Sequence, residues 1–422
     1  MTPPAPSVTA LEIMPVFGQS ENRPLESDYF DGLDAATAGQ VYYVSGLATE
    51  AGAEIGPAGA GTAAINQGVP ANGFRSAAGY GLVSPAFTFQ MARAARWRDA
   101  GNTGRGVIIG DNGSGGRFLN EWAPDDPSPL GRNQNFWMRQ AASRAAVLGL
   151  TVTAPYFYLF QGQSGGLWTY QEYMTAFDNA DDFMADQAAA SFGADPKPIT
   201  VVIGGTVNTV DRPYENAKAQ YDLTLDLGGI LATWQRAYLI GDNYIHPRPR
   251  EQVLIGETCE WAAAEVEAGN AWNITHSVVK SGAVVTVSFA LRPGETLMNR
   301  AGMYADYGGD AATSPNFGFE ADGGIASVVP NYAGNTVTVT LSNPAATWLR
   351  FAMQRQSVFA RYHEIVDDDG ETRRLNYSAH RTTLFGSHTR ASRFVPGETL
   401  WRPLPGFRAA FAGDAVTYPD NW

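Results

Sequence analysis

The stretch LEIMPVFGQS, residues 11–20, joins a mostly apolar run to a glycine and a serine. We predict that Leu11–Phe17 is a buried strand, because its composition suits burial on both faces of a sheet. Strands that alternate with longer helical patterns are typical of a parallel sheet with crossover helices. The expected fold class is therefore a doubly wound α/β domain. Its further strands are predicted at Val107–Gly110, Val152–Phe160, Ile199–Gly204 and Ala237–Ile240.

Helical patterns lie between these runs. We expect helices over Phe87–Asp99, Phe136–Leu148, Thr169–Ala190, Tyr214–Trp234 and Arg250–Ala268. Residues 46–84 are rich in Gly, Ala and Ser, and the segment is too long for an ordinary connection. We therefore expect a surface excursion there that shapes a site.

The pattern changes after about residue 269. Ala283–Leu291 and Thr336–Leu341 alternate in hydrophobicity with a period of two, which predicts antiparallel strands. Tyr362–Val366 and Thr372–Leu375 flank the acidic turn Asp367–Gly370 and predict a hairpin. Two domains are expected: an α/β domain over residues 1–268 and a β-rich accessory domain over residues 269–422 that binds carbohydrate or another partner.

Composition excludes several classes of function. The chain has 422 residues and a net charge of −13, so it would repel nucleic acid. There is no run of 18 apolar residues, which argues against a membrane span. One cysteine, Cys259, allows no internal disulfide and no thiolate metal site, and we expect it to be a buried structural thiol.

The expected location of the protein follows from its first residues. Met1–Pro6 contains neither the basic segment nor the apolar segment of a Sec signal peptide. We therefore expect either a cytoplasmic protein or a component of a virion or phage-like particle that is released by lysis. Assembly into such a particle or into a homo-oligomer is left open.

Polar residues follow the predicted strands at the points where these strands end. Ser20 follows the first strand, Gly110–Arg117 the second and Gln161 the third, and His246 follows the fifth. The carboxyl ends of parallel strands meet at one edge of a sheet, where ligands bind. Each signal is weak alone, because a serine after a strand is usually a helix N-cap and a glycine-rich loop is usually a turn.

Together these residues match the parts of a serine hydrolase. Such chemistry needs a hydroxyl nucleophile, an imidazole base, a carboxylate that orients the base, and hydrogen-bond donors for the oxyanion. Ser20, His246 and Asp242 fit the first three roles, and Gly115 with Gln161 fits the last.

Four short blocks extend this match to a known family. They are Val16–Ser20, Gly115–Trp122, Gln161–Ser164 and Ile245–Pro247, and they occur in family order over residues 11 to about 262. The chain resembles the SGNH hydrolases, and more narrowly the sialate O-acetylesterase-like carbohydrate esterases. The resemblance implies a three-layer flavodoxin-like fold and hydrolysis of O-acetyl esters on sugars, with no metal and no organic cofactor.

The same resemblance implies roles for individual residues. Ser20 matches the nucleophile, and its N–H matches the first oxyanion donor. Gly115 or Gly116 matches the second donor, and Gln161 matches the third. His246 matches the base. The implied reaction removes O-acetyl groups from sialic acid or from a capsular or cell-surface polysaccharide through an acetyl-Ser20 intermediate.

The chain departs from the family pattern near the base. Asn243 stands where the family has an aspartate three residues before His246, and Asp242 stands one residue earlier. Either Asp242 orients the base or a serine–histidine dyad operates. Gln163 replaces a usual glutamate, and Glu21 replaces a common asparagine. The alternative function is therefore a catalytically impaired, glycan-binding spike or fibre protein of a phage or phage-like particle that attaches to the host capsule.

Three residues near these blocks are candidate substrate contacts. Trp168 and Tyr170 follow the Gln161 block, and aromatic rings stack on sugars. Arg117 suits the carboxylate of a sialic or uronic acid, although an ion pair with Glu121, four residues on, explains it equally well. The expected partner is an acetylated glycan or capsular polysaccharide. The remaining histidines, His276, His363, His380 and His388, have no metal-ligand spacing.

Overall fold

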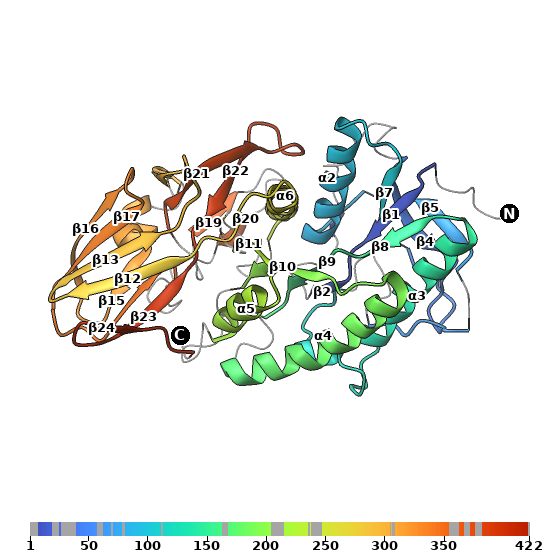
Figure 1. Ribbon diagram of the computed structural model, residues 1–422, viewed down its shortest axis with the longest axis horizontal. Helices are drawn as coiled ribbons and strands as arrows, with labels where there is room; N and C mark the ends of the chain where they lie inside the picture. Colours follow the sequence, from blue (N-terminus) through green and yellow to red (C-terminus); the bar gives the residue numbers. More distant parts are fainter. Residues whose placement is uncertain are drawn as a thin grey trace.

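A computed structural model describes residues 7–18, 25–26, 39–56, 62–68, 71–77, 81–110, 113–162, 168–203, 215–234, 237, 247–303, 305, 309–353, 363–366, 372–375 and 382–420. These residues form an α/β part built on parallel strands and a β-rich part built on antiparallel sheets (Figure 1). The mixed fold class predicted from the sequence is confirmed at this level.

Nine short strands form the central sheet of the α/β part. They run in the orders β5-β4-β7-β1-β8 and β11-β10-β9-β2, and every pairing is parallel except β4 with β5. Their bounds are β1 (Ala10–Ile13), β2 (Val16–Gly18), β4 (Val41–Ser45), β5 (Gly73–Ser76), β7 (Arg105–Ile108), β8 (Thr151–Thr153), β9 (Tyr156–Phe160), β10 (Lys197–Val202) and β11 (Ile230–Trp234). A separate pair joins β3 (Leu25–Glu26) to β6 (Leu82–Val83).

Prolines divide two of the predicted strands. Pro15 separates β1 from β2, and Pro155 separates β8 from β9, because proline has no N–H to donate to a ladder. The Tyr158 N–H still donates to the Pro15 carbonyl at 2.8 Å, so the two halves of the sheet stay joined. Counting β1 with β2 and β8 with β9, the core strands follow the order 2-1-3-4-5 of flavodoxin-like doubly wound folds.

Helices cover both faces of this sheet. α2 and α6 lie on one face, and α3, α4 and α5 lie on the other (Figure 1). Their bounds are α2 (Pro85–Asp99), α3 (Leu130–Val147), α4 (Tyr170–Phe192), α5 (Glu215–Asp226) and α6 (Pro249–Glu267). Local signals set two of the starts, since the Ser84 hydroxyl caps α2, and Thr169 forms a capping box with Glu172 at α4.

Two sequence expectations for this part are wrong. The helix predicted over Tyr214–Trp234 ends at Asp226, because Gly228 adopts a left-handed φ of +63° and the next apolar run becomes β11. β11 is thus an unpredicted strand that pairs with β10. Of the strand predicted at Ala237–Ile240, only Ala237 lies within the described residues. The excursion over residues 46–84 is not confined to the surface, because it contains β5, which extends the sheet beside the unpredicted β4.

Two facing sheets form the body of the β-rich part. Their orders are β12-β13-β17-β16 and β15-β18-β23-β24, and Phe289 meets Phe351 across them with 5.5 Å between ring centroids. The strands are β12 (His276–Ser281), β13 (Val284–Phe289), β15 (Phe319–Ala321), β16 (Ile325–Asn331), β17 (Thr336–Leu341), β18 (Trp348–Phe351), β23 (Phe407–Ala412) and β24 (Ala415–Thr417). The alternation predicted over Ala283–Leu291 and Thr336–Leu341 is thus confirmed by β13 and β17.

The other strands of the β-rich part form a third sheet and a hairpin. β14 (Leu297–Asn299), β21 (Leu384–Ala391) and β22 (Thr399–Pro403) form a third sheet. β19 (His363–Val366) and β20 (Thr372–Leu375) pair antiparallel as predicted, and their turn Asp367–Gly370 lies outside the described residues. The short helices are α7 (Asp310–Thr313), η2 (Leu119–Trp122) and η4 (Pro315–Gly318). The domain boundary at residues 268 and 269 stays a prediction.

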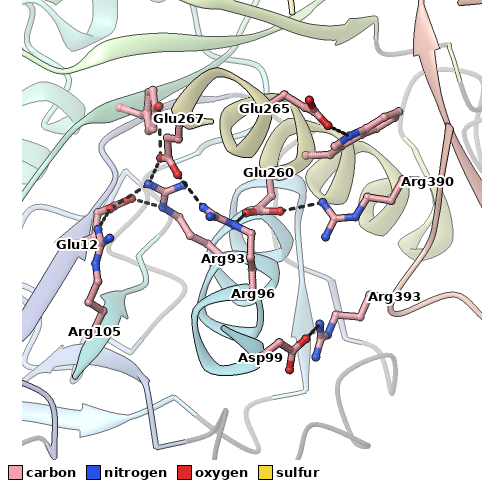
Figure 2. A network of polar contacts seen from close by, with 12 residues as sticks. Glu12, Arg93, Arg96, Asp99, Arg105, Glu260, Glu265, Glu267, Arg390 and Arg393 are labelled. Atoms are coloured by element: carbon pink, nitrogen blue, oxygen red, sulfur yellow. Dashed lines mark hydrogen bonds and ion pairs between the residues drawn. The ribbon is translucent and has the colours of Figure 1, made fainter. Parts of the chain in front are cut away.

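Ion pairs of the buried Glu260 join α6 to both parts of the chain (Figure 2). Glu260 on α6 pairs with Arg96 on α2 and lies 3.3 Å from Arg390 on β21. At the end of α2, Asp99 accepts from Arg393 at 2.6 Å. Arg390 therefore links β21 to α6.

A second buried pair lies close to this junction. Arg402 on β22 is 1% exposed and pairs with Glu295. Its Nε also donates to the Trp272 carbonyl at 3.2 Å, and its guanidinium lies over the Trp272 ring. Burial of this charge is thus compensated by a carboxylate and by a backbone carbonyl.

The crossing of α2 and α6 requires a glycine. A Cβ on Gly256 would lie 2.4 Å from the Pro85 carbonyl oxygen and 2.5 Å from Thr88 Cβ. We expect Gly256→Ala to lower the free energy of unfolding by about 1–3 kcal/mol, because the helices must move apart. Urea denaturation measures it. Gly68→Ala is the control, since its Cβ would meet only a side-chain oxygen at 3.3 Å. Equal stabilities of the two variants would contradict the prediction.

The β-rich part contains a largely buried histidine. His276 stacks on Phe407 with 4.2 Å between centroids, and burial lowers its pKa from 6.5 to about 4, with a smaller effect of Lys218. Between these two pKa values, the imidazole is protonated in the unfolded chain and neutral in the folded chain. This contribution to stability is complete above pH ~6.5 and is lost as the pH falls towards ~4.

We expect His276→Phe to remove this part of the pH dependence. Between pH 7 and pH 4, the unfolding free energy of the wild type should decrease by about 1–3 kcal/mol more than that of the variant. Chemical denaturation at both pH values measures the difference. A variant whose stability falls as steeply as the wild type would show that His276 is not responsible.

Candidate functional site

The carboxyl edge of the parallel sheet gathers three of the predicted blocks. β2 ends at Gly18, and the Ser114 N–H donates to the Gly18 carbonyl at 3.1 Å. The loop that contains Gly115 and Gly116 therefore rests on the end of β2, two residues before Ser20. Ser20 itself lies outside the described residues.

Gln161 ties the third block to the same loop. It follows β9, is fully buried, and donates from Nε2 to the Arg117 carbonyl at 2.9 Å. The opposite orientation of the amide would set Oε1 against that carbonyl, so the contact fixes which atom is nitrogen. Gln161 Oε1 is buried with no partner among the described residues. The ends of β2 and β9 and the glycine loop therefore form one connected edge.

Side chains of α4 and α5 donate hydrogen bonds to the backbone of this edge. The Tyr173 hydroxyl and Gln220 Nε2 donate to the Gln161 carbonyl at 2.8 and 3.1 Å. Gln220 Oε1 also accepts from the Ile203 N–H at 2.9 Å, and Asn216 Nδ2 donates to the Gly162 carbonyl at 2.9 Å. Sequence reasoning missed Asn216 and Gln220, although their spacing of four residues places them on one face of a helix.

The predicted substrate contacts differ in their surroundings. Arg117 Nη1 lies 3.0 Å from Glu121 Oε1, so the ion pair expected as the alternative is present. Trp168 is half-buried beside Phe118 and Tyr173. The Tyr170 hydroxyl donates to Asp222 at 3.0 Å, and burial and this carboxylate raise the pKa of Tyr170. The hydroxyl of Tyr170 is therefore engaged by α5.

The fourth block leads into α6. Asp242, Asn243 and His246 lie outside the described residues, as does Gln163, while Pro247 is buried just before α6 begins. In the first turn of α6, Glu251 is buried and lies 3.1 Å from both Arg248 and Arg250. Burial raises the pKa of Glu251, and the two guanidiniums oppose this shift.

The described structure also bears on the single cysteine, on clusters of metal-ligating side chains and on helix length. Cys259 is fully buried, and burial raises the pKa of its thiol to about 12, so it is a structural thiol. Within the part of the chain that the structure describes, no three acidic, histidine or cysteine side chains are grouped to hold a metal. Among the described helices, none is long and apolar enough to cross a membrane.

Comparison with solved structures identifies the architecture. No family model and no curated protein matches the sequence. A carbohydrate acetylesterase from Xanthomonas citri superposes with a TM-score of 0.50 at 16% identity, over 90% of this chain and 81% of that chain. The two proteins share a fold. The match covers 90% of this chain, whereas residues 1–268 make up less than two-thirds of it. The shared fold therefore includes strands of the β-rich part.

A second carbohydrate acetylesterase, from Sinorhizobium meliloti, matches more weakly. It is 14% identical, with a TM-score of 0.29, over 61% of this chain and 99% of that chain.

Proposed function

We propose that this protein is a serine esterase that removes O-acetyl groups from carbohydrate. The observation that carries the proposal is the connected edge, where the Gly18–Ser114 and Gln161–Arg117 hydrogen bonds hold three sequence blocks together. The fold shared with a carbohydrate acetylesterase supports the same class of reaction. Sialic acid and capsular or cell-surface polysaccharide are the candidate carriers of the acetyl group.

In the proposed reaction, the Ser20 hydroxyl attacks the acetyl carbonyl and passes its proton to His246. Asp242 orients the imidazole, or the pair works as a dyad. The oxyanion accepts hydrogen bonds from the N–H of Ser20 and of Gly115 or Gly116, and from Gln161. The sugar leaves with the proton from His246, and water then releases acetate from acetyl-Ser20.

Gln161 has two functions in this proposal. Its Nε2 carries two hydrogens, and one of them holds the loop through the Arg117 carbonyl. The second hydrogen is assigned to the oxyanion. The amide that completes the oxyanion hole thereby also fixes the position of the glycine donors.

The proposal is tested by labelling with a fluorophosphonate, which reacts with activated serines. Intact mass and peptide mapping should find a single adduct on Ser20 in the wild type and none in Ser20→Ala. A folded wild-type protein that is not labelled would contradict the esterase proposal. Asn243, in place of the aspartate of the similar esterases, would then favour a glycan-binding protein on an esterase scaffold.

A further inference from the structure

A row of aromatic rings runs from beneath the candidate site to the surface. Tyr173 is fully buried, and its hydroxyl donates to the Gln161 carbonyl at 2.8 Å. The Trp168 ring meets Tyr173 edge-on at 6.4 Å between centroids, and Phe118 stacks on Trp168 at 5.7 Å with 27° between the planes. Phe118 is 41% exposed. The row therefore begins at the predicted oxyanion donor and ends at an open phenyl ring.

The backbone around Phe118 is fixed next to the site. The preceding carbonyl, of Arg117, accepts from Gln161 Nε2 at 2.9 Å, and the N–H of Phe118 donates to Glu121 Oε2 at 2.7 Å. Trp168 supports the ring from α4's N-terminal side. Both the carbonyl and the N–H of the peptide between Arg117 and Phe118 are therefore hydrogen-bonded, which holds Phe118 beside the glycine loop.

Exposure of this ring is unusual within the molecule. In the described part of the chain, the other large apolar side chains that are exposed are valines, leucine or tyrosines, and Phe118 is the one exposed phenylalanine or tryptophan. A phenyl ring has no polar group that gains from contact with water, and the stacked pair of Phe118 and Trp168 offers an aromatic face on which a ligand with an apolar face can pack.

We infer that Phe118, backed by Trp168, is the platform for the pyranose ring that carries the acetyl group. The inference rests on the proposed function and adds its substrate class. The C–H face of a pyranose is apolar and flat enough to pack on a phenyl ring. Such a platform selects a ring and makes no contact with the reacting ester. Acetyl esters of pyranoses are therefore the substrates, in preference to small alkyl acetates.

The test compares two esters that differ in the ring. Hydrolysis of β-D-glucose pentaacetate and of ethyl acetate is followed by acid release at constant pH. For Phe118→Ala we expect kcat/KM to fall about five- to tenfold for the sugar ester. The value for ethyl acetate should stay within about twofold, because that ester has no ring to stack.

Matched variants separate a platform from a merely structural side chain. Phe118→Tyr keeps the aromatic face and should retain wild-type rates, whereas Phe118→Leu should lose as much as Phe118→Ala. Tyr332→Ala, at an exposed ring in the β-rich part, should change neither rate. Equal losses on both esters, or full activity of Phe118→Leu, would overturn the inference. A wild type that cleaves neither ester would instead overturn the proposed function, and the platform with it.

Discussion

Replacing Ser20 with Ala is expected to lower kcat for an acetyl ester by on the order of 10⁴-fold or more. In the proposed reaction, the hydroxyl oxygen of Ser20 forms the bond to the acyl group, and alanine has no such oxygen. What remains is the contribution of the oxyanion donors and of binding. The thermal midpoint should stay within about 1–2 °C of the wild type, because the change removes one oxygen atom.

Rates are measured by acid release, and folding is measured by calorimetry on the same samples. Ser277→Ala is the matched control, because this exposed serine lies on β12, in the β-rich part of the chain. It should retain full activity. Turnover at the wild-type rate in Ser20→Ala would end the assignment of the nucleophile.

Replacing Arg402 with Ala is expected to lower the free energy of unfolding by about 3–5 kcal/mol. The variant leaves the buried Glu295 with only the more distant cation Arg292, at 3.8 Å, and it removes the donors that reach the Trp272 carbonyl. Replacing both partners, in Arg402→Met with Glu295→Leu, should recover much of this loss, because no uncompensated charge then remains buried.

Urea denaturation gives the three stabilities. Arg75→Ala is the control, since Arg75 pairs with Glu54 at 3.3 Å where both side chains are about half exposed. A surface pair of this kind contributes about 1 kcal/mol or less. A loss from Arg402→Ala as small as that from Arg75→Ala would refute the importance of burial at this pair.

The elements predicted correctly are those whose sequence signals, such as a capping box or an alternation in hydrophobicity, lie within the element itself. The helix at Thr169–Ala190 is confirmed as α4 because its capping box lies within four residues, and β17 is confirmed because its alternation spans the strand. β11 was missed because Ile230–Trp234 continues a helical pattern past Gly228. It becomes a strand through its pairing with β10, which is a long-range contact that no local window contains.

In the candidate site, too, local signals were recognised and features that depend on long-range contacts were missed. The glycine loop and Gln161 were found because strand ends are recognisable in the sequence, and the structure brings them together. Gln220 was missed because its role depends on a contact between α5 and the Gln161 carbonyl, 59 residues away along the chain. Phe118 was missed because exposure is a property of the folded chain. The placement of Ser20, Asp242 and His246 stays a prediction.

Helix α6 limits how this protein could have been assembled from separate genes. Its Glu257 is buried and accepts from the Ser392 hydroxyl and from the Arg393 N–H at 2.6 Å. Its Glu260 bridges Arg96 and Arg390. Recombination that exchanged everything after residue 268 would remove both donors to the buried Glu257 and would leave Glu260 with Arg96 alone. The two halves are therefore expected to descend together, with substitutions on α6 matched by substitutions on β21.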